Sequence, residues 1–285
     1  MTKIRSTDKS HIQDRRGQSS GGGLGFPIPG GLKGGGGLLG IVVLLASLFL
    51  PKLLGSGQSS SVSSDTGNSG AVTCETEIEQ VVCGVANDVQ EYWAQALPQS
   101  FGVDYQYTDV VWFTEGVSTA CGNASSQTGP FYCPADSLVY VDLGFLLQLE
   151  EQLVGTTSDL AEQYILAHEY GHHVQNILGT NAEAQRVAER DAELGRQYGI
   201  ALELQADCFA GAWVGARNVL ENAAELDEAL DAAEAVGDDR IQEKTQGRID
   251  PESWTHGSAE QRKQWFLAGY NSTDPRQCDT FAEIG

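Results

Sequence analysis

The chain has 285 residues and a formal net charge of −22 at pH 7. This length suits one catalytic domain of about 200 residues after a short N-terminal segment, which is enough chain to bury a sizeable core. The charge is unevenly spread, because residues 1–55 hold seven Lys/Arg and two Asp and sum to +5, which leaves −27 for the rest. A domain this acidic repels nucleic acid and anionic lipid, so we expect no binding to DNA or RNA.

Four segments follow one another along the chain. Residues 1–37 are basic and then rich in glycine, a composition that cannot build a core, and we expect a disordered cytoplasmic tail. Residues 38–55 include the apolar run LLGIVVLLASLFL and are expected to form a transmembrane signal anchor. Residues 56–73 are typical of a flexible Gly/Ser-rich linker. Residues 74–285 should then form the folded domain.

The apolar run is shorter than the roughly 20 residues that a membrane span needs, although flanking glycines and leucines lengthen it. Basic residues precede the run and should stay inside, which predicts a single-pass protein of the cell membrane with an extracytoplasmic domain. A cleaved signal peptide is the second interpretation, and a buried core helix is the third.

All the cysteines follow the apolar run. An even number on one side of a membrane span predicts disulfides in an oxidising compartment, and buried free thiols are the alternative. No C-x-x-C pair occurs, so a cysteine zinc site is not expected. The six cysteines are Cys74, Cys83, Cys121, Cys133, Cys208 and Cys278.

A few short strands precede a long helical region. Residues rich in Val, Tyr and Trp predict strands at 104–114 and 138–143, separated by a turn-rich loop. Apolar residues at helical spacing predict helices at 77–96, 159–178, 182–195, 198–222, 225–236 and 258–269. Pro98 should end the first of these helices, and Gly179 and Gly237 stand where helix C-caps are expected. A small sheet followed by many helices indicates the α+β class.

The sequence His168-Glu169-Tyr170-Gly171-His172 lies within the predicted helix 159–178. Residues four apart share one helix face, so both imidazoles can reach one metal ion. Glu169 can then take a proton from a metal-bound water, which is the chemistry of the H-E-x-x-H motif. His173 points about 100° away from His172 and is expected on the helix surface or behind the ligands. We therefore predict a Zn²⁺ site at His168 and His172 with Glu169 as the catalytic residue.

A catalytic zinc needs a third protein ligand and one open position. Glu203 and Asp207 lie four apart in a helix whose other residues are mainly apolar, so their carboxylates need a partner. We favour Glu203 as the ligand over His256, with Asp207 receiving the far N–H of a ligand histidine. An acidic pair on a solvated helix face is the alternative.

His256 stands just before the last predicted helix, where Ser258 can be the N-cap. It can stabilise the oxyanion as a carbonyl is attacked, or it can be a histidine bonded to backbone at a helix entry. Tyr170 and Tyr140 are weaker candidates for a phenolic donor. Strand 138–142 is a candidate sheet edge along which a peptide substrate could pair.

These motifs resemble the bacterial family described as putative neutral zinc metallopeptidases. The resemblance implies a zincin-like domain that needs zinc, His168 and His172 as ligands, Glu169 as the catalytic residue, and Glu203 as third ligand with Asp207 in support. It also implies the disulfides Cys208–Cys278 and Cys121–Cys133. The matching stretches are DRRG (14–17), GPFYCPAD (129–136), LAHEYGHHVQ (166–175), ELQADCFAGAW (203–213), GDDRIQ (237–242), THGSAEQR (255–262) and CDTF (278–281).

Cys74 and Cys83 remain as a third pair by elimination. If Cys83 lies well inside a helix that begins at Glu77, the rise of about 1.5 Å per residue makes this bridge awkward. We expect either that the helix begins later or that these two cysteines stay unpaired.

The function predicted is a zinc endopeptidase that acts on a peptide or protein substrate and is tethered to the membrane by its N-terminal helix. A non-catalytic, membrane-tethered binding protein that contains zinc is the alternative. A hydrolase of cell-wall peptides or of non-peptide amides is a third possibility, since the same zinc centre could perform it.

Overall fold

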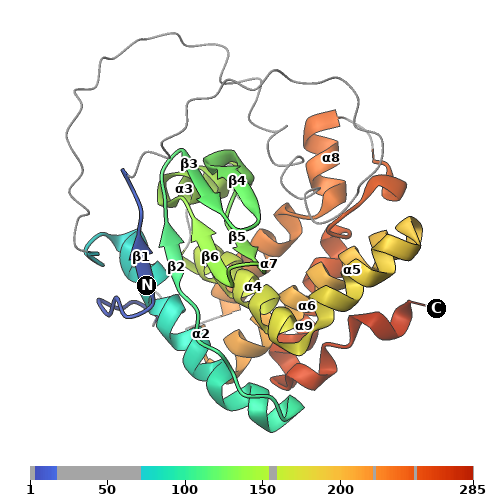
Figure 1. Ribbon diagram of the computed structural model, residues 1–285, viewed down its shortest axis with the longest axis horizontal. Coiled ribbons are helices and arrows are strands. Elements are labelled where there is room, and N and C mark those ends of the chain that lie inside the picture. The colour runs from blue at the N-terminus through green and yellow to red at the C-terminus, as the bar shows by residue number, and fades with distance from the viewer. Residues whose placement is uncertain (1–3, 18–71, 154–158, 221–222, 247–248, 285) are drawn as a thin grey trace.

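The computed structural model describes residues 4–17, 72–153, 159–220, 223–246 and 249–284 (Figure 1). The predicted anchor at 38–55 and residues 56–71 of the predicted linker lie outside these ranges. Within the described ranges, no helix combines the length and apolar character that a membrane crossing requires.

Helices make up most of the described chain, and the α+β prediction is confirmed. Two helices were not predicted from the sequence, α3 and α8, and both are short. The α-helices are α2 (Glu77–Phe101), α3 (Leu143–Leu153), α4 (Asp159–Leu178), α5 (Thr180–Arg190), α6 (Ala192–Arg217), α7 (Ala223–Ala235), α8 (Asp238–Gln246) and α9 (Ala259–Ser272). Short 3₁₀ turns lie at Ser126–Thr128, Pro251–Ser253, Pro275–Gln277 and Thr280–Glu283.

A small sheet lies beside the helices, in the order β1-β2-β6-β5 (Figure 1). β1 (Ile12–Asp14) and β6 (Leu138–Val141) each run parallel to β2 (Val110–Trp112), and β5 (Phe131–Cys133) runs antiparallel to β6. A separate hairpin joins β3 (Gly116–Thr119) to β4 (Gly122–Ser125). The prediction of a sheet edge at 138–142 is wrong, because β6 is paired on both sides and β5 forms the edge.

The N-terminal residues are part of the folded domain. β1 pairs with β2, and Ile12 is 7% exposed within the core. Arg5 binds Asp159 at the start of α4 through bonds of 2.7–3.1 Å, and Arg16 binds Glu79 of α2 at 2.9 Å. The prediction of a disordered tail is therefore wrong for residues 4–17. Ion pairs and strand pairing with distant parts of the chain hold this segment in place, and composition alone does not reveal such contacts.

α2 begins at a capping box formed by Thr76 and Glu79 and continues beyond Pro98. The prediction that Pro98 ends the helix is wrong. The helix ends at Gly102, which has a φ of 69° and donates its N–H to the carbonyl of Pro98. A glycine adopts this left-handed conformation without steric cost, and so the helix ends there, one turn after the proline.

Close packing of α6 against α4 and α9 places the residues of the motif. A Cβ atom on Gly171 of α4 would lie 2.9 Å from the Cα atom of Ala206 in α6. A Cβ atom on Gly269 of α9 would overlap the carbonyl oxygen of Cys208. Glycine at these positions lets the backbones approach, and the contact at Gly171 lies between the two histidines of α4 and opposite the carboxylates of α6.

Each of the six cysteines is in a disulfide. The Cys121–Cys133 and Cys208–Cys278 bridges agree with the pairing that the resemblance implies. The doubt about Cys74–Cys83 is wrong, because α2 does begin at Glu77 and the two Cα atoms are nevertheless 6.4 Å apart. Cys74 precedes the N-cap, so the bridge joins the approach to the helix with its second turn.

Candidate metal centre

Three side chains from α4 and α6 converge on one point. His168 Nε2 lies 3.1 Å from His172 Nε2 and 3.2 Å from Glu203 Oε2. His172 Nε2 lies 3.5 Å from Glu203 Oε1. Glu203 is more than 30 residues from the histidines in the sequence, but the crossing of α4 and α6 brings it next to them in space. These three are the only group of potential metal ligands found among the described residues.

The other nitrogen of each histidine is already bonded. His168 Nδ1 lies 2.8 Å from Asp207 Oδ1, and His172 Nδ1 lies 2.8 Å from Gln175 Oε1. The Gln175 amide is oriented by its Nε2, which donates to the carbonyl of Leu202 at 2.7 Å. Both partners accept, so Nδ1 of each ring donates and the lone pair of each Nε2 points at the convergence point.

Two imidazole lone pairs and a carboxylate therefore face one another. These electron-rich atoms repel one another unless a cation lies between them. Imidazole nitrogens together with a carboxylate oxygen form a donor set that binds Zn²⁺. The residues present fit zinc in number and in chemistry, because a catalytic zinc takes three protein ligands of these types. The second bond of each ring fixes the ring orientation that a metal would require.

The electrostatics also favour positive charge at this point. Burial opposes ionisation of Glu203, but His172 and His168 outweigh it and hold the pKa of Glu203 well below its ordinary value. Burial likewise works against the charged form of His168, while Asp207 and then Glu203 outweigh it and raise the pKa of His168 to about 10. The pKa of His172 is lowered by burial. Metal binding would displace the second proton from His168, which frees the Nε2 lone pair for the ion.

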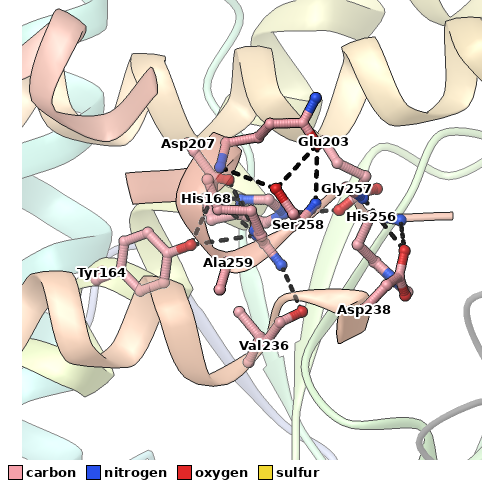
Figure 2. A network of polar contacts seen from close by, with 12 residues as sticks. Tyr164, His168, Glu203, Asp207, Val236, Asp238, His256, Gly257, Ser258 and Ala259 are labelled. Carbon is pink, nitrogen blue, oxygen red and sulfur yellow. Dashed lines mark hydrogen bonds and ion pairs between the residues drawn. The ribbon is translucent and has the colours of Figure 1, made fainter. Parts of the chain in front are cut away.

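A buried network supports His168 from behind (Figure 2). Asp207 is 0% exposed and accepts from Arg262 Nε at 2.7 Å, from Arg262 Nη2 at 2.8 Å and from the Tyr164 hydroxyl at 2.5 Å. Arg262 Nη1 also donates to the carbonyl of Val236 at 3.2 Å. The Asp207 carboxylate is thus fully paired, and its orientation toward His168 is fixed by groups from α4 and α9.

Glu169 lies next to the ligands on α4 and is 8% exposed. Burial raises the pKa of this carboxyl to about 8, against the opposing effects of His168 and of the nearby Tyr132 backbone in β5. The edge strand β5 and the Glu169 carboxyl are therefore adjacent.

His256 precedes α9 and is bound through Nδ1 to Asp238 Oδ1 at 3.0 Å. It does not belong to the ligand group, although it lies close enough to Glu203 to be among the groups that lower the pKa of that carboxyl. The preference for Glu203 over His256 as third ligand agrees with this geometry.

The remaining candidates lie elsewhere. His173 is 2% exposed, with Nδ1 3.0 Å from the Tyr132 hydroxyl and Nε2 2.6 Å from the carbonyl of Gln106, so the prediction of a surface position is wrong. The Tyr140 hydroxyl donates to Asp136 at 2.7 Å. Tyr170 is 0% exposed, and its hydroxyl is without a hydrogen-bond partner in the part of the chain that is described.

Sequence reasoning missed four residues of the site: Tyr164, Gln175, Asp238 and Arg262. Two of them carry a local signal, since Tyr164 lies one helical turn before His168 and Gln175 lies three residues after His172. Asp238 and Arg262 lie in the stretches GDDRIQ and THGSAEQR that carry the family resemblance, but their contacts depend on how α8 and α9 pack on the helices of the motif.

Comparison with known proteins shows the family to which the chain belongs. The model of the family described as "putative neutral zinc metallopeptidase" matches residues 1–281. The uncharacterized protein YpfJ of Escherichia coli strain K12 is 39% identical over 284 residues, which cover 97% of each chain. The uncharacterized protein Rv2575 of Mycobacterium tuberculosis strain H37Rv is 43% identical over 218 residues, covering 72% of this chain and 71% of the relative. No solved structure matches. This chain belongs to the putative neutral zinc metallopeptidase family.

Proposed function

We propose that this protein is a zinc-dependent endopeptidase. The observation that carries the proposal is the convergence of His168 Nε2, His172 Nε2 and Glu203 beside the buried carboxyl of Glu169. His168, His172 and Glu203 would hold the zinc ion. When bound, zinc polarises the substrate carbonyl and lowers the pKa of a coordinated water toward about 7.

Glu169 is the general base in this proposal. Its carboxylate takes a proton from the attacking water and passes it to the amine that leaves when the C–N bond breaks. His256 supports the reaction by donating a hydrogen bond to the carbonyl oxygen as negative charge develops there.

The substrate chain would lie along β5 rather than β6. β5 is an edge strand of the sheet, and the backbone of its residue Tyr132 lies near Glu169, so a peptide added to that edge would pass this carboxylate. The proposal therefore moves the substrate-binding edge from residues 138–142 to residues 131–133.

We further propose that the folded domain works outside the cytoplasm, which its three disulfides support. Attachment to a membrane through residues 38–55 stays a prediction. Residues 4–17 pack on the peptidase domain, so in this arrangement both lie on the same side of any membrane.

Zinc-dependent cleavage of casein tests the function. Glu169→Gln should keep stoichiometric zinc and lose hydrolysis, because the amide binds in the same place and cannot accept the proton. Glu162→Gln on the same helix is the matched control and should keep both. Full activity in Glu169→Gln would refute the mechanism. A wild-type protein that binds zinc tightly and cleaves nothing would favour the alternative, a non-catalytic zinc-containing binding protein.

A further inference from the structure

Two neighbouring aspartates at the start of α8 hold the segment that carries His256. Asp238 Oδ2 accepts the backbone N–H groups of Thr255 at 2.6 Å, His256 at 2.5 Å and Gly257 at 3.2 Å. Asp239 Oδ1 accepts the N–H of Ala259, the first residue of α9, at 2.7 Å. The first turn of α8 therefore fixes the backbone on both sides of Gly257.

Only one of the two aspartates reaches the imidazole. Asp238 Oδ1 lies 3.0 Å from His256 Nδ1, and the Thr255 hydroxyl lies 3.0 Å from the same nitrogen. Asp238 is 0% exposed and His256 is 6% exposed, so water competes little for these bonds. With Nδ1–H donated to Asp238, Nε2 is the ring atom that is left for a substrate, and it can donate to a carbonyl oxygen when the ring carries a proton on both nitrogens.

The segment lies against the metal centre. A Cβ atom on Gly257 would be 3.3 Å from the side chains of Ile200 and Leu204, which flank Glu203 on α6. Gly257 has a φ of 84°, a conformation that a residue with a side chain rarely adopts. In Figure 2 the residues His256 and Gly257 lie between Glu203 and Asp238.

We propose that Asp238 is a positioning residue for catalysis, which holds the His256 ring by Nδ1 so that Nε2 is presented to the substrate carbonyl oxygen at the metal centre. This inference rests on the proposed peptidase function and extends it to a residue outside the metal ligands and their direct partners. Asp238 acts through His256 and does not touch the substrate.

Asp238→Asn separates positioning from folding. The amide oxygen can still accept the three backbone N–H groups, while the amide nitrogen cannot accept from Nδ1. The ring must then rotate away from the amide nitrogen or give up the Nδ1 proton, so the doubly protonated ring that can donate from Nε2 loses its support. We expect kcat to fall about 10- to 100-fold with little change in KM or in zinc content, as for other groups that orient a catalytic side chain. Asp239→Asn weakens the bond to the Ala259 N–H in the same segment but does not change a contact of the His256 ring. If the bond from Asp238 to the ring carries the effect, this variant should keep kcat within about 2-fold of the wild type.

Double substitution gives the decisive measurement. His256→Ala should lower kcat about 100- to 1000-fold, and adding Asp238→Asn should then cost nothing more, because the two residues act as one unit. The ¹⁵N spectrum of the histidines should show a protonated Nδ1 at His256 in the wild type and in Asp239→Asn, and its loss in Asp238→Asn.

Three outcomes would overturn the proposal. One is a cost of Asp238→Asn that is the same with and without His256. Another is an equal loss of kcat in Asp239→Asn. In both cases an active wild-type enzyme leaves the peptidase function standing. The third is a wild-type protein that shows no zinc-dependent hydrolysis, which would overturn the peptidase function and this inference together.

Discussion

Asp207 bonds to His168, and replacing it should change the stability of the fold and the affinity for zinc by separate amounts that can be measured independently. Asp207→Asn leaves the volume nearly unchanged but removes one acceptor oxygen from a carboxylate that receives four bonds, two from Arg262 and one each from Tyr164 and His168. The amide cannot satisfy all four, and Arg262, which is 3% exposed, is left as a buried charge without its counter-ion. Breaking a buried ion pair in this way costs about 3–5 kcal/mol of stability.

Zinc affinity should fall by a separate amount. Without a carboxylate on Nδ1, His168 loses its fixed tautomer and some of its basicity, and loss of such a group costs about 10- to 100-fold in metal affinity. Competition with a chromophoric chelator measures the affinity, and urea unfolding of the metal-free protein measures the stability.

A second aspartate–arginine pair supplies the control. Asp88 of α2 binds Arg217 and the Trp213 Nε1 of α6, away from the metal ligands and partly exposed to solvent. Asp88→Asn should cost about 1 kcal/mol and leave zinc affinity unchanged. If Asp207→Asn binds zinc as tightly as the wild type does, the orienting role of Asp207 is refuted, whatever happens to the stability.

The remaining predictions concern the third ligand, the pH dependence of stability and the topology. Glu203→Ala should lose zinc while His256→Ala keeps it, and the opposite result, measured as metal content, would exchange the two assignments. Burial and Asp159 raise the pKa of Glu162 to about 8, with Arg5 opposing and Glu77 adding to the rise. The folded state therefore binds a proton that the unfolded state has lost, and stability falls as pH rises from about 4.5 to 8. Glu162→Gln should remove this fall in the free energy of unfolding, which amounts to at most about 5 kcal/mol at about 1.4 kcal/mol per pKa unit. If the difference in unfolding free energy between the variant and the wild type does not grow between about pH 4.5 and 8.5, the raised pKa of Glu162 is contradicted. When protease is added to intact cells, epitope tags at the two ends of the chain should either both be cleaved or both be protected. Protection of the N-terminal tag alone would show that residues 4–17 are not packed on the domain.

Local sequence was sufficient for the parts of the site that lie on one helix. The spacing of His168, Glu169 and His172 places all three along one turn of α4, because helical periodicity is fixed by backbone geometry. The choice of Glu203 and Asp207 followed from the cost of burying carboxylates in an apolar helix, and the structure brings both to the histidines.

Contacts between segments that are distant in the sequence could not be predicted from local sequence patterns. Pairing of β1 with β2 and the contact of Arg5 with Asp159 depend on long-range packing, so a composition that predicted disorder gave the wrong result for residues 4–17. The edge position of β5 depends on strand order, which the pattern of a single strand does not encode.

The sequence by itself determined which side chains are available to the candidate site: two histidines and a glutamate on one helix, a pair of carboxylates on another, and cysteines suited to disulfides. The tertiary structure alone decided the geometry. Only the crossing of α4 and α6 at Gly171 brings Glu203 within 3.5 Å of both histidines, and only the docking of α8 and α9 places Asp238 against His256 and Arg262 against Asp207. The physical reason is that ligand identity is a property of single residues, whereas convergence is a property of packed backbones.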